Sequence, residues 1–506
     1  MLACPVVCPH TTCRLRQFRS HISVGSLTPP STDSSGGSST CKRLGVPDLT
    51  RFTGNNSVAW SSVLIGVVAA GLTVVAPFAG NRASALLIIG VVTLGILIAS
   101  SRSLPFATLC WVLVTFVFPP WIYLMLAGTR LAPAAIISVL VIAARIGKTR
   151  LRINIIDALV LALILVSLLG TAFASTPTHI FSQIVLEWGL PYLAARVLSA
   201  DVSLLTRLPV LGLVLGLLAI AQSVTRIDLA SFPPFSFSVG ATNWMGLQGR
   251  AGLVRAELTT GQSIALGGIL VLLLPFALSA ERKMLRVTSS IALIGGILAT
   301  LSRAALVSGI IAIFLCLWFS AMSKATKSIL LVLTVAAAGA AATVFGDFLE
   351  RSGGNELSDS TNYRGGLLGL IRYANPLGLA SNAVPSGRGA TFFWDTFYSI
   401  DNGLLYVALY AGVIAAIAFI LMVVVLGWKL VRGSVNPATI AIVAQIPLLV
   451  SVAPITQYQN FLWFFIGLAA SWTYALRKPA ADESRATTSP GLETASPRIR
   501  QMSANS

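Results

Sequence analysis

The sequence predicts an all-α membrane protein: a polytopic helix bundle of about 12 to 14 transmembrane helices, with a long extracytoplasmic loop before the last three. Three observations predict this fold. Of 506 residues, 55% are hydrophobic and 10% are charged, and the mean hydropathy is +0.83. Apolar runs approaching the roughly 17 to 25 residues of a membrane-spanning helix recur along the chain. Lysine falls on one side only of the predicted bilayer, as the positive-inside rule expects.

The predicted helices follow the apolar runs in order, and several runs are short enough to leave the count between about 12 and 14. The runs cover residues 58–79, 84–100, 104–126, 131–146, 155–174, 181–198, 207–224, 262–280, 287–301, 304–320, 327–345, 401–427, 437–454 and 459–476. Residues 287–320 as one helix would be about 50 Å long, against a hydrocarbon core of about 30 Å. We therefore expect a turn near Ser302 and Arg303, at the outer face.

The net charge of +18 would suggest nucleic acid as a partner in a soluble protein. Here the pattern of basic residues favours a topological cause, with both termini cytoplasmic in a multi-pass protein of the cytoplasmic (inner) membrane. Under this topology the inner side receives both lysine and arginine, whereas the outer side receives arginine alone. The outer arginines are Arg82, Arg130, Arg226, Arg250, Arg255, Arg303, Arg351, Arg364, Arg372 and Arg388. Nucleic acid is thus not an expected partner, whereas membrane lipid is.

The chain divides into three predicted parts. Residues 1–57 form a disordered basic cytoplasmic tail, residues 58–476 the membrane domain, and residues 477–506 a second disordered cytoplasmic tail rich in Pro, Ser and Thr. Two long loops, residues 225–261 and 346–400, fall on the outer side. Both loops are rich in Gly, Asn, Arg and aromatic residues, and loops of this kind carry functional sites.

Arg255, Arg303 and Arg364 are the candidate anion-binding residues. Arg255 lies just before a span, Arg303 at the predicted turn, and Arg364 in the glycine-rich segment NYRGG. The guanidinium group offers a planar fork that binds two phosphate or carboxylate oxygens and stays charged. The alternative for each arginine is an anchor at the bilayer boundary.

The pair Asp401–Asn402 opens an apolar helix, and it is the candidate catalytic pair. A carboxylate there can serve as a general base, or it can simply cap the helix. No metal and no cofactor is expected. The N-terminal residues Cys4, Cys8, His10 and Cys13 have a spacing that fits no standard zinc pattern, and the chain contains no Walker A, GxSxG or HExxH motif.

Four segments, in this order, resemble the O-antigen ligase and O-antigen polymerase family over residues 58–476. They are VRAELTTGQSIALGG, TLSRAALVSGIIA, NYRGGLLGLIRYANPLG and SIDNGLLYVALYAGVIAAIAF. The resemblance implies a GT-C type glycosyltransferase that acts on undecaprenyl-diphosphate-linked glycan at the outer face of the cytoplasmic membrane. It also implies that Arg255 and Arg303 hold the lipid diphosphate, that an acceptor glycan is the second substrate, and that other polysaccharide export proteins are possible partners.

The chain departs from the family at Asp401–Asn402, where the ligases have a His-Asn pair. An aspartate is a weaker base than histidine near neutral pH, so a polymerase-like transferase is favoured over a ligase. Sugar stacking on Trp244, Phe392, Phe393 or Trp394 is expected, with interfacial anchoring as the alternative. The rival function is a polysaccharide or lipid-linked glycan transporter or flippase, and a third reading is a structural membrane protein without activity.

Overall fold

The structure is a computed structural model, and all the residues it describes belong to one compact unit within residues 61–506. It describes residues 93–472, apart from the following gaps. These are 120, 127–128, 150, 174–175, 202, 229–245, 251, 321–322, 324, 330, 333–334, 337–338, 340–362, 364, 386–391, 394–399 and 434. Both predicted tails, residues 1–57 and 477–506, therefore lie outside the described residues, as do parts of both predicted long loops.

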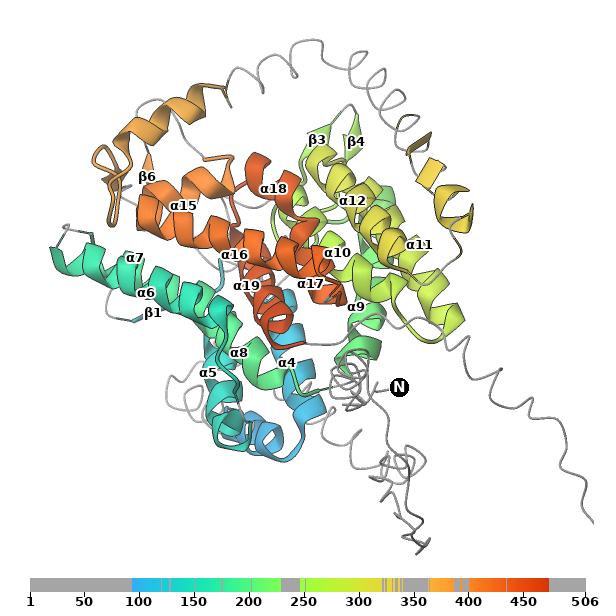
Figure 1. Ribbon diagram of the computed structural model, residues 1–506, viewed down its shortest axis with the longest axis horizontal. Helices are drawn as coiled ribbons and strands as arrows, with labels where there is room; N and C mark the ends of the chain where they lie inside the picture. The colour runs from blue at the N-terminus through green and yellow to red at the C-terminus, as the bar shows by residue number, and fades with distance from the viewer. Residues whose placement is uncertain are drawn as a thin grey trace, which may run out of the picture. The chain divides into compact units, whose positions relative to one another are not determined.

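Helices dominate the part of the chain that is described (Figure 1). The helices are α4 (Leu104–Val117), α5 (Pro133–Arg145), α6 (Ile155–Phe173), α7 (Thr178–Gln183), the π-helical η4 (Ile184–Gly189), α8 (Leu190–Leu198), α9 (Leu204–Thr225), α10 (Ser263–Leu278), α11 (Lys283–Ala299), α12 (Arg303–Phe319), α15 (Gly403–Ala411), α16 (Val413–Val431), α17 (Pro437–Val443), α18 (Ile446–Ser451) and α19 (Thr456–Ser471). Two 3₁₀ helices, η3 (Ile146–Lys148) and η8 (Gly369–Tyr373), are also present. The strands pair as antiparallel hairpins, β1 (Leu124–Leu126) with β2 (Thr129–Leu131), β3 (Gly249–Arg250) with β4 (Leu253–Val254), and β5 (Val384–Pro385) with β6 (Phe392–Phe393).

Three helices, α6, α9 and α16, are long and apolar enough to cross a bilayer. Shorter apolar helices are Leu104–Val117, Ser263–Leu278, Arg303–Phe319 and Pro437–Ser451. The prediction of a helical membrane protein is therefore confirmed at this level. The predicted number of about 12 to 14 spans stays a prediction, because several of the predicted runs fall on residues that are not described.

One end of the bundle, which we call the basic end, is held by cationic side chains. Arg207 donates to the carbonyl of Pro105, so α4 and α9 begin at the same end of the bundle. Arg196 forms an ion pair with Asp157 at 2.8 Å and donates to Ser471 Oγ at 2.6 Å. The start of α6 and the end of α19 therefore lie at this same end.

The other end, which we call the site end, gathers the opposite termini of the same helices. Thr259 Oγ1 donates to the carbonyl of Phe116 at 2.6 Å, and Gln457 Nε2 donates to the carbonyl of Thr259 at 2.9 Å. The backbone N–H of Glu257 donates to Gln222 Oε1 at 2.8 Å. These bonds join the ends of α4 and α9 to the starts of α10 and α19, so α4 and α9 run toward the site end and α10 and α19 run away from it. Which end faces the cytoplasm stays a prediction.

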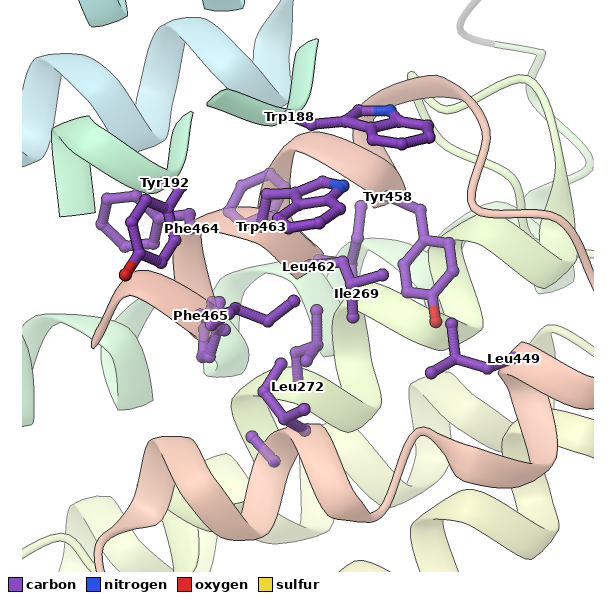
Figure 2. Close-up of a cluster of buried hydrophobic side chains, with 14 of the residues drawn as sticks. Trp188, Tyr192, Ile269, Leu272, Leu449, Tyr458, Leu462, Trp463, Phe464 and Phe465 are labelled. Atoms are coloured by element: carbon purple, nitrogen blue, oxygen red, sulfur yellow. The ribbon is translucent and has the colours of Figure 1, made fainter. Parts of the chain in front are cut away.

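The core surrounds α10 and α19, which are buried on all sides; α10 is apolar all round, whereas α19 also buries the polar side chains of its first turns. Aromatic rings fill the space around α19. Trp111 of α4 stacks on Phe464 with centroids 3.9 Å apart, and Trp188 of η4 stacks on Trp463 at 5.4 Å (Figure 2). This packing places the middle of α19 between α4 and η4.

Two predicted spans are each broken into two helices. The run 401–427 divides at Gly412, which has a φ of 100° and separates α15 from α16. The carbonyl of Pro376 would lie 2.7 Å from a Cβ at this position, so only glycine fits. The run 437–454 divides between α17 and α18. Apolar composition alone did not reveal either break, because both flanking helices are apolar.

Candidate functional site

The turn between α11 and α12 lies where the sequence predicts it. Helix α11 ends at Ala299, and α12 begins at Arg303, after an N-cap in which the Ser302 hydroxyl accepts from the backbone N–H of Ala305 at 3.3 Å. Leu301 has a φ of 50°, an uncommon conformation for a branched side chain. The predicted break at Ser302 and Arg303 is thus confirmed, and Arg303 occupies the first turn of a helix.

Arg255 is anchored to this same turn. Its Nε donates to the carbonyl of Thr300 at 3.1 Å, and its Nη1 donates to Gln248 Oε1 at 3.2 Å. The next backbone N–H, from Ala256, donates to the carbonyl of Ala299 at 2.9 Å. The structure therefore brings together the segments that carry Arg255 and Arg303, although they are far apart in sequence.

Arg250 is a third arginine at the turn, and sequence reasoning did not single it out. Its Nη1 donates to the carbonyl of Leu301 at 3.2 Å. Arg250 pairs with Leu253 in the β3–β4 hairpin (Figure 1), and Gly252 in the hairpin loop has a φ of 77°. The sequence signal was this glycine, because glycine is common in two-residue hairpin loops that need a positive φ.

We call Arg250, Arg255 and Arg303, together with residues 300–302, the arginine cluster. Two of the arginines donate to consecutive carbonyls, those of Thr300 and Leu301. The third begins α12, where the positive end of the helix dipole adds to the field. The turn thus carries three arginine residues, and a guanidinium group can bind two oxygens of a phosphate or carboxylate anion at once.

Glu257 is the carboxyl group beside the cluster. Its side chain accepts from the backbone N–H of Gln248 at 3.2 Å, and the residue is 3% exposed. Burial raises the pKa of Glu257 to about 7, although the hydrogen bond from Gln248 and the charge of Arg255 both oppose the shift. The nearby charge of Asp228 raises the pKa further. Near neutral pH this carboxyl therefore changes between its neutral and charged forms.

The structure assigns the cap of α15 to Asn402 rather than to Asp401. Asn402 Oδ1 accepts from the backbone N–H of Leu405 at 2.9 Å. Asp401 precedes the cap and is partly exposed. The expectation that Asp401 could serve as an ordinary N-cap is therefore wrong, because the amide one residue later takes that position. Its predicted role as a base stays a prediction.

Helix α18 connects the two parts of the candidate site, since it packs against both α12 and α15. At the start of α15, a Cβ on Gly403 would lie 2.9 Å from the carbonyl of Leu449. This close approach explains why a glycine follows Asn402. The arginine cluster lies at the start of α12, and Asp401 lies just before the start of α15. Both helices pack against α18, so the cluster and Asp401 lie at the same end of the bundle.

The remaining predicted residues are only partly covered. Arg364 lies outside the described residues, as do Trp244 and Trp394 and the possible zinc ligands Cys4, Cys8, His10 and Cys13. Phe392 and Phe393 form β6, paired with β5. Within the described part of the chain, no three His, Cys, Asp or Glu side chains group as metal ligands would.

A second group of polar side chains surrounds the π-helical turn η4. Tyr406 of α15 connects this group to Asn402. Tyr406 follows Asn402 by one turn of α15, and its ring centroid is 6.5 Å from that of Trp188 in η4. Glu187, in the same π-helical turn, accepts from Gln459 Nε2 of α19. Sequence analysis did not single out Glu187, because a single carboxylate near the end of a span has no motif. The structural signal is the π-helical turn, which often marks a functional site.

No protein-family model matches this chain, and no curated protein or solved structure matches it either. The likeness to the O-antigen ligase and polymerase family therefore rests on the four sequence segments and stays a prediction.

Proposed function

We propose that this protein is a membrane glycosyltransferase that polymerises or transfers a lipid-diphosphate-linked glycan, most simply one carried by undecaprenyl diphosphate, in surface polysaccharide biosynthesis. The observation that carries the proposal is the arginine cluster. Arg250 and Arg255 are held on neighbouring carbonyls of the turn that leads into Arg303. A diphosphate offers several charged oxygens within a small volume, and arginine forks suit such a group better than lysine does.

The proposed reaction joins two sugars and releases the lipid diphosphate. A hydroxyl oxygen of the acceptor glycan attacks the anomeric carbon of the donor with inversion. The bond between that carbon and the phosphate oxygen breaks, and the diphosphate leaves with the electron pair. The arginine cluster stabilises the growing negative charge, as preorganised donors do in other enzymes. Arg364 is proposed to assist this stabilisation or to position glycan.

The proton of the attacking hydroxyl passes to Asp401 in this proposal. Asn402 would orient that carboxylate, because it is the next residue and its backbone is fixed as the helix cap. Its side-chain oxygen accepts from the backbone N–H of Leu405. The aspartate in place of the family's histidine favours a polymerase over a ligase. The proposed location is the outer face of the cytoplasmic membrane, with other polysaccharide export proteins as partners.

One observation favours the rival function, a transporter or flippase for a similar glycan. Glu187 is an ionisable group within a run of residues predicted to span the membrane, and its hydrogen-bond donor is the neutral amide of Gln459. Ionisable groups inside spans often serve ion-coupled transport. A transporter of a lipid-linked glycan would also bind a diphosphate, so the arginine cluster suits both functions and the location of the substrate in cells distinguishes them.

The deciding experiment follows lipid-linked repeat units in cells that lack the gene. A transferase defect leaves these units on the outer leaflet, where an external glycosidase removes their glycan. A flippase defect leaves them on the inner leaflet, protected from the enzyme. Accumulation of protected units would refute the transferase and support the rival.

A further inference from the structure

The first turns of α19 carry three amide side chains that the proposed diphosphate site does not use. We propose that Gln457, Gln459 and Asn460, together with Glu187, form a subsite for hydroxyl groups of the acceptor glycan. We call these four residues the acceptor subsite. The inference rests on the proposed function for the identity of the ligand, but its test does not depend on turnover.

The carboxylate of this subsite is held by a fixed chain of hydrogen bonds. Gln459 Nε2 donates to Glu187 Oε2, and Gln459 Oε1 accepts from Trp188 Nε1 at 3.4 Å. Gln459 is 5% exposed, whereas Glu187 is partly exposed. The amide therefore fixes one carboxylate oxygen from the buried side. Carboxylates and side-chain amides are the groups that accept from and donate to sugar hydroxyls.

Two buried oxygen atoms on the same helix require hydrogen-bond donors. Gln457 Oε1 and Asn460 Oδ1 have no hydrogen-bond partner in the described part of the protein, although these residues are only 2% and 6% exposed. A buried acceptor without a partner costs about 1 to 3 kcal/mol, so a donor that reaches such an atom would recover that cost. A hydroxyl can donate to them, whereas a phosphate group offers acceptors only.

The chemistry of the two sites is therefore complementary. The arginine cluster presents donors and suits phosphate, while the acceptor subsite presents unpaired acceptors and a carboxylate and suits hydroxyl groups. They are neighbours, because Gln457 Nε2 donates to the carbonyls of Thr259 at 2.9 Å and Phe118 at 3.0 Å. Thr259 lies four residues after Arg255 in the same chain segment.

Aromatic rings complete the environment expected for a sugar. Trp188 and the partly exposed Tyr406 have ring centroids 6.5 Å apart with planes tilted by 52°. The π-helical turn that carries Trp188 also carries Glu187, so one local distortion of the helix presents a carboxylate and an aromatic ring together. Tyr406 comes from α15, one turn beyond Asn402, and links this subsite to the proposed base Asp401.

The test measures sugar binding without catalysis, on purified full-length protein in lipid nanodiscs. The probes are glucose, galactose, mannose, rhamnose and N-acetylglucosamine, each titrated while the thermal unfolding midpoint is recorded. At least one sugar should raise the midpoint of the wild-type protein in a saturable way. Glu187→Gln and Asn460→Leu should each weaken that binding about tenfold, the loss expected for one hydrogen bond at a buried site.

Asn460→Leu is the sharper variant, because it removes an oxygen that has no partner among the described residues and should leave stability unchanged or raise it. The matched control is Thr439→Val in α17. Its hydroxyl is also buried without a partner in the described part of the chain. Thr439 lies near the basic end, because it is one turn from Asn436, and the Asn436 amide donates to the carbonyl of Trp472. The control should bind sugar as the wild type does.

Inorganic pyrophosphate, titrated in parallel, tests the arginine cluster independently. Stabilisation by pyrophosphate in all of these variants, with sugar binding lost in Glu187→Gln and Asn460→Leu alone, supports both sites. Unchanged sugar binding in these two variants, or no sugar that stabilises the wild type, would overturn the acceptor subsite. Sugar binding without any effect of pyrophosphate would uphold the subsite and count against the proposed diphosphate site.

Discussion

Arg255 donates from Nε to the backbone carbonyl of Thr300, three residues before Arg303. This contact joins the loop that precedes α10 to the end of α11, and the backbone bond from Ala256 to Ala299 at 2.9 Å reinforces it. Arg255 and Arg303, which the sequence predicts separately as anion ligands, thus belong to one structural unit. A change at either residue should therefore affect the same binding event.

Replacing Arg303 with lysine keeps the charge but removes the planar fork. If Arg303 stabilises a departing diphosphate, Arg303→Lys should lose about 2 to 4 kcal/mol of transition-state stabilisation, which is about 30-fold to 1,000-fold in rate. The measurement is glycan elongation on a lipid-linked substrate, with unfolding followed in parallel. Near-normal elongation by a well-folded variant would make Arg303 an anchor at the bilayer boundary and no more.

Arg250 is the arginine that only the structure assigns to the cluster. Arg250→Gln should weaken pyrophosphate binding about tenfold, because a charged hydrogen-bonding partner is lost. Arg226→Gln is the matched control, since Arg226 is exposed at the C-cap of α9 and also carries one positive charge. Equal losses in the two variants would show a general effect of charge rather than a specific contact.

The sequence was sufficient to predict helices and the turn at Ser302. These features depend on apolar length and on local capping, which a single sequence displays. It was not sufficient to identify Arg250, the cap at Asn402 or the contact of Glu187 with Gln459. Each of these depends on a partner or a backbone geometry that only the folded chain shows. The division of the predicted span 401–427 at Gly412 was missed for a similar reason, because the close approach of Pro376 sets that break.

Asp401→Asn tests the proposed base without disturbing the helix start, because the cap is Asn402. We expect elongation to fall by about 10²- to 10⁴-fold, the usual contribution of a general base, with an unchanged unfolding midpoint. Asn402→Ala should instead lower stability by about 1 kcal/mol, whereas Asn402→Ser keeps a capping oxygen and should retain most of it. Full activity in Asp401→Asn would remove Asp401 from the mechanism.

Glu257 makes the stability of the protein depend on pH. Its pKa in the folded state is about 7, above the ordinary value of 4.5. The folded protein therefore holds this proton more tightly than the unfolded chain does. The contribution of this group to the free energy of unfolding is fully present below about pH 4.5 and is lost as the pH rises to about 7.

Glu257→Gln should remove this part of the pH dependence, because the amide resembles the neutral carboxyl group at every pH. Unfolding midpoints of the wild type and the variant, measured between about pH 4.5 and pH 7, should diverge as the pH rises, with the variant the more stable near pH 7. Parallel curves would show that the Glu257 carboxyl does not titrate in this range.

Cysteine labelling tests which end of the bundle faces outward. In a variant without the four N-terminal cysteines, Arg226→Cys marks the site end and Glu281→Cys, between α10 and α11, marks the other end. An impermeant maleimide added to intact cells should react at position 226 and not at 281. The reverse pattern would place the arginine cluster in the cytoplasm, where the proposed substrate is not presented.

The left-handed backbone of Leu301 has an energetic consequence for ligand binding. A branched residue in this conformation costs about 1 to 2 kcal/mol, and the guanidinium groups of Arg250 and Arg255 help to hold it through the carbonyls of Leu301 and Thr300. A ligand that draws those groups away would let the turn relax. Occupancy of the arginine cluster would thereby be coupled to the shape of the α11–α12 junction, and Leu301→Gly, which adopts this φ without strain, would uncouple the two.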